Sequence, residues 1–196
     1  MAPASSPRSK IPMKALDNLF TRGLVRYVGA SNMSAWQIMK AQGLARQYSY
    51  ARFETAQCCY TIAGRDLERE IVPMVSDQQI GLMIWSPLAS GFLAGKFTRE
   101  GAATSNDARR LSFDFPPVDK EHAYDVIEAI QPIAASRLRA SRSPLHQKPV
   151  TSVIVGAKSI EQLDDNLAAT EIELSADELA TLDKISARPF AAVSIG

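Results

Sequence analysis

The sequence predicts an α/β fold in which four parallel strands alternate with helices. Short runs of β-branched and other apolar residues recur near residues 25–30, 53–57, 80–85 and 151–155. The stretches between these runs carry apolar residues three or four positions apart, which is typical of amphipathic helices. Strands that alternate with helices in this way form a parallel sheet with right-handed crossovers.

The length and composition suit a single folded domain. The 196 residues are 46% hydrophobic and 22% charged, which is ordinary for a globular protein with a full-sized core. Residues 1–10 are rich in Ser, Pro and Ala, so we expect a disordered N-terminal tail there. Residues 11–196 are expected to form the domain.

The composition also argues against several classes of partner. The formal net charge of +1 gives no general attraction to nucleic acid or to an acidic membrane. No apolar run approaches the roughly 20 residues of a membrane span, and the N-terminus lacks the apolar region of a secretory signal. The only cysteines, Cys58 and Cys59, are adjacent, which argues against a disulfide framework and fits a reducing cytoplasm. With His122 and His146 as the only histidines, no cluster has metal-ligand spacing. We therefore expect a cytoplasmic protein without nucleic-acid or membrane partners.

The first two helices follow from their boundary signals. Pro12 opens a helix that Gly23 should end, because proline suits a helix start and glycine a helix stop. After the strand at 25–30, Ser34 and Gln37 form a capping box for a second helix. The large apolar residues of these two helices are Leu16, Leu19, Phe20, Trp36, Met39 and Leu44.

The middle of the chain repeats the order of strand and helix. The strand at 53–57 is followed by a helix that begins near Arg65 and should end at Pro73. The strand at 80–85 leads into a loop, Ser86–Gly91, whose proline and glycine fix the backbone while small residues allow a ligand to approach closely.

The next part of the chain is expected to hold a loop and two helices. We predict a mobile surface loop from after Lys96 to about Phe113, then a helix over residues 119–135. A capping box from Ser175 to Glu178 opens the last helix. The inward positions of these two helices are expected at Tyr124, Ile127, Ile130, Ile133, Leu179, Leu182 and Ile185.

The fourth strand and the helix after it, within residues 151–166, have the features of an anion site. The strand is broken by Gly156, and Ser159 with Gln162 forms a capping box, so that a helix should begin directly after Ser159. The unpaired N–H groups and the positive dipole end of this helix would face the turn, beside the Lys158 ammonium. A generic strand, turn and helix with a surface lysine is the alternative.

Polar and aromatic residues gather where the four strands end. Parallel α/β sheets place their ligand sites at these carboxyl ends. Each residue could instead cap a helix, fill the core or pair with the backbone, but their coincidence at all four ends favours a ligand site. The residues are Ser31, Asn32, Gln57, Trp85, Ser86, Gly156 and Lys158.

Four segments of the sequence resemble the aldo-keto reductases. RYVGASN, the step from Gln57 to Tyr60, IWSPLASG and VTSVIVGAKSIEQLDDN occur in the order and spacing of that family. The resemblance covers most of residues 11–186 and is to strands five to eight of the family's (β/α)8 barrel. It implies a partial TIM-type (β/α) barrel, a half-barrel of four parallel strand-helix units.

The resemblance implies an NADP(H)-dependent oxidoreductase that reduces aldehydes or ketones to alcohols. At the nicotinamide end, Ser31, Asn32 and Gln57 resemble the residues that hydrogen-bond the carboxamide, and Trp85 resembles the aromatic residue that stacks on the ring. A carboxamide needs donors and acceptors at fixed positions, and the ring needs a flat apolar face.

The resemblance also implies residues for the phosphate and adenosine ends. The loop that follows the pyrophosphate is matched by Ser86, Leu88 and Gly91. The 2′-phosphate positions are matched by Lys158 and Ser159, which is why NADP is the expected cofactor. The pair that contacts the adenosine is matched by Gln162 and Asn166.

The family's catalytic residues have no counterpart in this sequence. By resemblance, a tyrosine protonates the developing oxyanion with help from a lysine, an aspartate and a histidine, and all four belong to the first half of the barrel. We therefore assign no catalytic residue and expect the isolated chain to be inactive. The alternative is a catalytically inactive half-barrel, either a truncated gene product or a module that binds itself or a partner through exposed sheet edges.

The segment 136–148 departs from the family pattern. It is short, carries Arg137, Arg139 and Arg142, and lacks an apolar helical stripe. A replaced segment or a natural basic loop would both leave one covering helix missing. We therefore expect partly exposed faces on the last two strands.

Overall fold

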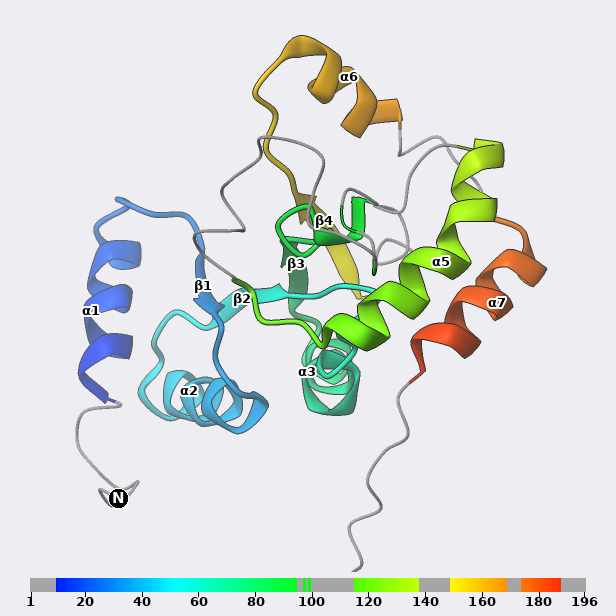
Figure 1. Cartoon of the computed structure of the whole chain (residues 1–196). Helices are drawn as coiled ribbons and strands as arrows, with labels where there is room; N and C mark the ends of the chain where they lie inside the picture. Colours follow the sequence, from blue (N-terminus) through cyan, green and yellow to red (C-terminus); the bar gives the residue numbers. More distant parts are fainter. Residues whose placement is uncertain are drawn as a thin grey trace, which may run out of the picture. The chain divides into compact units, whose positions relative to one another are not determined.

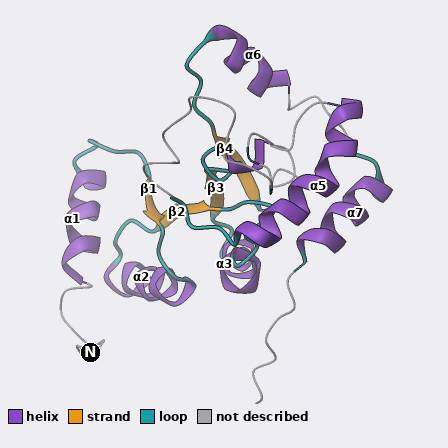
Figure 2. Ribbon diagram, in the orientation of Figure 1, coloured by secondary structure: helices purple, strands orange, loops and turns teal. Residues whose placement is uncertain are grey.

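The structure is a computed structural model that describes residues 10–94, 97, 99, 115–137, 149–168 and 174–187. Helices and strands alternate along the chain, as Figures 1 and 2 show. The elements are α1 (Lys10–Thr21), β1 (Val28–Ser31), α2 (Ala35–Tyr48), β2 (Phe53–Cys59), α3 (Leu67–Asp77), β3 (Gly81–Trp85), the 3-10 turn η2 (Phe92–Ala94), α5 (Lys120–Arg137), β4 (Val150–Ile154), α6 (Ile160–Ala168) and α7 (Ala176–Ser186).

The four strands form one parallel sheet in the order β1-β2-β3-β4. Sequential strands are neighbours, as expected for strand-helix units that wind in one direction. The sheet confirms the predicted α/β class with four parallel strand-helix units, and it is consistent with part of an α/β barrel. The register of β1 on β2 pairs Gly29 with Thr55 and Ser31 with Gln57.

The N-terminal helix α1 ends at the predicted glycine. Gly23 has φ +69°, and its N–H donates to the Phe20 carbonyl at 2.9 Å. Glycine adopts this left-handed conformation without strain, which explains the stop. The helix begins at Lys10, two residues before the expected start; the rest of the predicted tail, residues 1–9, lies outside the described residues.

Helix α2 begins at the predicted capping box, in which the Gln37 side chain accepts from the Ser34 N–H at 3.1 Å. Its buried face differs from the large apolar residues of the sequence: Trp36 is 57% exposed and Met39 39%. Small residues and Ile38 fill that face instead. Gln42 is buried there, and its amide both donates to and accepts from the backbone of Phe53, which ties the start of β2 to α2.

The prediction that Pro73 ends α3 is wrong, because the helix continues to Asp77. Ile71, Met74 and Val75 are buried on both sides of the proline. Burial of this apolar face outweighs the hydrogen bond that proline cannot make.

The strand positions were predicted to within three residues at each end.

The contacts divide the chain into two compact units. The first contains α1, β1, α2, most of β2, α3 and β3, and its fully buried side chains include Ile38, Val75, Leu82 and Ile84. The second contains the loop after β3, α5, α6 and α7, and its core is a separate cluster in which α5 packs on α7. The members of this cluster are Ile62, Ala63, Ala89, Phe92, Leu93, Ala123, Val126, Ile127, Ile130 and Leu182.

The helices of the second unit follow the sequence predictions. Ile127, Ile130 and Leu182 are buried, and Tyr124 and Ile185 pack against the same cluster. The reciprocal capping box of Ser175 and Glu178 opens α7. The side chain of Ile133, most of the loop predicted from Lys96 to Phe113 and most of the segment 136–148 lie outside the described residues. None of the described helices is long and apolar enough to cross a membrane.

The expected exposure of the last two strands is confirmed for β4 only. Three of the five β4 residues are exposed and none is buried. In β3, by contrast, Leu82 and Ile84 are fully buried. Leu82 and Ile84 belong to the buried core, whereas no residue of β4, which lies at the edge of the described sheet, does so.

Two glycine substitutions test the β1–β2 packing. A Cβ at Gly29 would overlap the Thr55 hydroxyl and lie 3.1 Å from the Thr55 carbonyl oxygen, whereas a Cβ at Gly43, in α2, would meet nothing within 4 Å. We predict that Gly29→Ala lowers the free energy of unfolding by about 1–3 kcal/mol. Gly43→Ala should raise it by about 0.5–1 kcal/mol, because alanine favours the helix. Urea unfolding measures both, and shifts of the same sign would contradict the packing.

Candidate functional site

The ends of β1 and β2 hold a cluster of three polar side chains. Because the register places Ser31 beside Gln57, the Ser31 hydroxyl lies 3.4 Å from Gln57 Oε1. Asn32 donates its backbone N–H to the Gln57 carbonyl at 2.9 Å and its side-chain amide to Ser31 Oγ at 3.1 Å. Asn32 has φ +52°, a left-handed conformation that asparagine tolerates and that turns the chain at the strand end.

The donor set of this cluster fits a carboxamide. Ser31 and Asn32 are exposed, and Gln57 is half-buried, so all three can be reached by a ligand. Together they offer a hydroxyl, two amide carbonyl oxygens and two amide NH2 groups. A carboxamide presents one acceptor oxygen and one NH2 donor, and this cluster can satisfy both.

The neighbouring cysteine, Cys58, is buried and chemically quiet. Side chains alternate along β2, and Cys58 is buried where Gln57 is not. Burial raises the pKa of the Cys58 thiol, and a hydrogen bond with the Asn32 backbone offsets the shift only in part. The thiol therefore stays protonated at neutral pH, which disfavours a role as nucleophile.

Trp85 ends β3 and forms a flat aromatic surface. Its ring stacks on Phe115, with ring centroids 5.7 Å apart and planes inclined by 15°. Trp85 is half-buried and Phe115 is 45% exposed, so the pair lies at the surface of its unit. Sequence reasoning missed Phe115, because nothing local links it to a residue thirty positions earlier.

The loop after β3 has an unusual backbone. Ser86, Ala89 and Ser90 all have φ between +50° and +54°, and Gly91 has φ +88°. The Ser86 hydroxyl accepts from the Ser90 N–H at 2.8 Å, and the Ser86 carbonyl accepts from the Ala89 N–H at 2.9 Å. Left-handed conformations in non-glycine residues cost energy and concentrate at ligand sites.

The side chains of this loop divide into two sets. Ala89 is fully buried, and Leu88 packs against the core of the second unit. Leu88 therefore anchors the loop to that core. Ser86 is half-buried and Ser90 exposed, which leaves their hydroxyls as the accessible polar groups.

The turn before α6 is the predicted anion site. Ser159 Oγ accepts from the Gln162 N–H at 3.3 Å, which confirms the predicted start of the helix at Ile160. Gln162 Oε1 accepts from the Lys158 N–H at 2.8 Å rather than from the cap residue itself. Lys158 and Ser159 are exposed, and Asn166, farther along α6, is half-buried.

Two features of this turn were not foreseen. Gly156 has open space around its Cβ position and its φ lies outside the left-handed region, so the turn does not depend on glycine. Glu161 lies in the first turn of α6, and a hydrogen bond from the Ser159 hydroxyl lowers the pKa of its carboxyl. An ionised carboxylate thus shares the helix N-terminus with Lys158, and it partly offsets the attraction for an anion.

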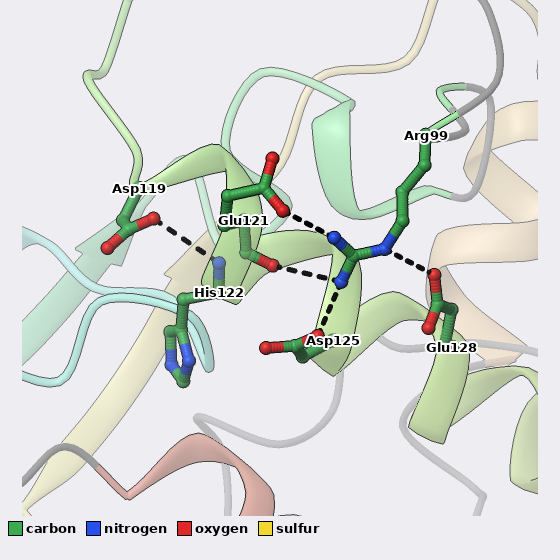
Figure 3. A network of polar contacts seen from close by, with 6 residues as sticks. All are labelled: Arg99, Asp119, Glu121, His122, Asp125 and Glu128. Atoms are coloured by element: carbon green, nitrogen blue, oxygen red, sulfur yellow. Dashed lines mark hydrogen bonds and ion pairs between the residues drawn. The ribbon is translucent and has the colours of Figure 1, made fainter.

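A network of ion pairs joins Arg99 to α5. The guanidinium of Arg99 pairs with Glu121, Asp125 and Glu128, as Figure 3 shows, and lies 5.5 Å from the centre of the Tyr124 ring. The hydrogen bond to Glu128, and after it that to Glu121, raises the pKa of Arg99. At the start of α5, Asp119 accepts from the His122 N–H at 3.3 Å. The network engages four of the five guanidinium N–H donors and fixes Arg99 on α5.

The structure brings the predicted site residues together in three local groups. Ser31, Asn32 and Gln57 form one group in the first unit. The Trp85 loop and the turn before α6 form two groups in the second unit. Within the part of the chain that the structure describes, no three His, Cys, Asp or Glu side chains lie close enough to hold a metal ion.

Comparisons with known proteins point to one family. The model of the aldo/keto reductase family matches residues 7–187. An aldo-keto reductase of Fusarium vanettenii is 31% identical over 180 residues, which cover 89% of this chain and 48% of that protein. The uncharacterised oxidoreductase YrpG of Bacillus subtilis is 30% identical over 176 residues, 90% of this chain and 53% of that protein. The versiconal hemiacetal acetate reductase of Aspergillus parasiticus is 26% identical over 183 residues, 91% of this chain and 53% of that protein.

The matched region covers nearly all of this chain but only part of each relative. The chain spans about half the length of the curated relatives it matches. The family model alone covers residues 7–187, well over half of the chain. The chain belongs to the aldo/keto reductase family.

Proposed function

We propose that this chain is the cofactor-binding half of an aldo-keto reductase, equivalent to strands five to eight of the barrel. The observation that carries the proposal is the cluster of Ser31, Asn32 and Gln57. Three side chains from two strands converge there by strand register, remain accessible, and match the hydrogen-bonding groups of a carboxamide.

The proposed cofactor is NADP(H), which supplies a hydride when bound. The β1–β2 cluster would hold the nicotinamide carboxamide, and Trp85 would offer its ring to the nicotinamide. The loop with Ser86, Leu88 and Gly91 would lie along the pyrophosphate. At the other end, Lys158 and Ser159 would hold the 2′-phosphate in the turn that contains Gly156, and Gln162 with Asn166 would contact the adenosine.

The choice of NADP(H) over NAD(H) rests on Lys158. Its ammonium is exposed beside the N-terminus of α6, where N–H groups and the helix dipole also favour negative charge. Glu161 works against this attraction, so Lys158 is needed to keep the turn attractive to a dianionic phosphate. The substrate class, by family, is an aldehyde or a ketone that is reduced to an alcohol.

No residue of this chain is assigned as the proton donor. The family's catalytic tyrosine, lysine, aspartate and histidine have no counterpart in the motifs found here, so we expect the chain alone to bind cofactor without turnover. The cytoplasm remains the proposed location, because two adjacent cysteines, one of them a buried free thiol, suit a reducing compartment.

A second candidate is a non-catalytic half-barrel that associates with itself or with a partner chain. The observation that favours it is the exposure of β4, an edge strand with no buried residue. Parallel sheets are ordinarily covered and free edges invite pairing.

Tryptophan fluorescence tests cofactor binding. Trp36 and Trp85 are the two tryptophans, and Trp36→Phe leaves Trp85 as the sole indole. We predict saturable quenching of this variant by NADPH, because a nicotinamide on Trp85 would accept its excitation. In a matched variant, Trp85→Phe, the remaining Trp36 lies on the exposed face of α2 and should show much weaker quenching.

The same preparations separate the two candidates. Saturable quenching without reduction of a nitrobenzaldehyde supports a cofactor-binding half that lacks the proton donor. Equal quenching of the two variants would rule out stacking on Trp85. Clear turnover by the purified chain would contradict the absence of a catalytic residue.

Lys158 tests the cofactor preference. We predict that Lys158→Ala weakens NADPH binding about tenfold, the loss of one charge-assisted phosphate contact, and leaves NADH binding unchanged. Lys184→Ala, on the exposed surface of α7, is the matched control and should change neither. Calorimetric titration measures both cofactors, and a parallel loss of NADH binding would show that Lys158 does not contact the 2′-phosphate.

A further inference from the structure

We propose that Phe115 covers the ring face of Trp85 that a ligand would use, and that its ring must leave this face before a nicotinamide can stack there. Both residues belong to the second compact unit. The inference rests on the cofactor site proposed above. It goes beyond that proposal because it assigns a residue that opposes cofactor binding.

The two rings are arranged as an indole and a bound ligand ring would be. Their centroids lie 5.7 Å apart, and their planes are inclined by 15°. Aromatic rings prefer such an offset stack, so a nicotinamide on Trp85 would need the same place over the indole. Phe115 is 45% exposed, and the indole face that it covers therefore lies at the surface of the unit, where a ligand can approach. Phe115 and a nicotinamide would compete for this face.

The backbone on both sides of Trp85 holds the indole in place. Trp85 ends β3, directly after Ile84, whose side chain is fully buried. On the other side, the Ser86 carbonyl accepts from the Ala89 N–H at 2.9 Å, and the Ser86 hydroxyl accepts from the Ser90 N–H at 2.8 Å. The indole is therefore the fixed member of the pair.

Phe115 combines an anchored backbone with an exposed ring. The next residue, Pro116, is buried, and Val118 packs against the core of the second unit. The Phe115 ring, by contrast, can turn to another rotamer in solvent without opening a cavity in that core. Rotation of one side chain is thus enough to uncover the indole.

A second aromatic stack in the same unit has the opposite character. Phe92 is 2% exposed and belongs to the core cluster, and its ring centroid lies 5.2 Å from that of Phe97. Removal of a ring there would leave a cavity. Trp85 is half-buried and Phe115 is exposed, so their stack can be exchanged for another ring at little cost to the core.

The stack should lower the affinity for the nicotinamide alone. An aromatic pair of this kind favours the stacked arrangement by about two- to tenfold. When only a fraction of the molecules can bind, the apparent dissociation constant rises by the same factor. A ligand that does not stack on Trp85 should not be affected.

Calorimetric titration of Phe115 variants tests this competition. We expect Phe115→Ala and Phe115→Leu to lower the dissociation constant of NADPH by about two- to tenfold, because both remove the competing ring. Phe115→Tyr keeps the ring and should leave the constant unchanged. Phe20→Ala is the matched control, because Phe20 is also 45% exposed but lies on α1. Adenosine 2′,5′-bisphosphate, which carries the 2′-phosphate but no nicotinamide, should bind equally to all variants.

A second measurement needs no cofactor. In chains that also carry Trp36→Phe, Trp85 is the sole indole, and its quenching by acrylamide reports how far it is covered. Quenching should rise in Phe115→Ala and Phe115→Leu, but not in Phe115→Tyr. Circular dichroism and thermal melting should show that all variants are folded, since the ring they alter is exposed.

The outcomes separate this proposal from the proposed function. Tighter binding of NADPH by Phe115→Ala, with unchanged binding of the bisphosphate, supports it. Weaker NADPH binding would overturn it and place Phe115 on the opposite ring face, as a support for the indole. Equal NADPH binding, an equal gain for the bisphosphate, or unchanged acrylamide quenching would overturn it but not the cofactor site. If no variant binds NADPH, the proposed function is wrong and this proposal is wrong with it.

Discussion

The parallel pairing of β1 with β2 is the constraint on which the candidate site depends. It brings Gly29 against Thr55 and Ser31 against Gln57, and the first pair admits no side chain at residue 29. Because both pairs lie on the same two strands, the position of Ser31 beside Gln57 follows from the close approach of Gly29 to Thr55. Asn32 then turns in a left-handed conformation that is held by the Gln57 carbonyl. The strand register and this turn together bring the Ser31 hydroxyl and the side-chain amides of Asn32 and Gln57 to one accessible point.

The proposed phosphate end depends on a different feature, the unpaired backbone N–H donors at the start of α6. Ser159 accepts from one of these donors, the Gln162 N–H, while Gln162 accepts from the Lys158 N–H just before the helix. Glu161 contributes a carboxylate whose pKa is lowered by the Ser159 hydroxyl. As pH falls through that lowered pKa, the carboxylate is neutralised and no longer opposes an anion at this helix end. Lys158 supplies the only positive charge in this turn, so the attraction for a phosphate depends on one side chain.

Local signals in the sequence predicted the element boundaries, and nonlocal packing accounts for the differences. Gly23 and the capping boxes at Ser34 and Ser175 act within a few residues, and they mark helix ends correctly. Pro73 failed as a stop because the buried face of α3 continues past it. The stacking of Phe115 on Trp85 joins residues far apart in the chain, and no periodicity or cap signals such a contact. The order of residues along the chain was enough to predict the site residues. Their contacts, such as that of Trp85 with Phe115, could be found only in the folded structure.

The central claim is that the ends of the four strands bind one dinucleotide. Titration of the isotope-labelled chain with NADPH, followed by two-dimensional NMR, tests it most directly. The account predicts saturable shifts with a single dissociation constant at Ser31, Asn32 and the Gln57 side chain, at the Trp85 indole, and at the amides of Lys158 and Ser159. Shifts confined to one of these groups, or different dissociation constants for different groups, would contradict it.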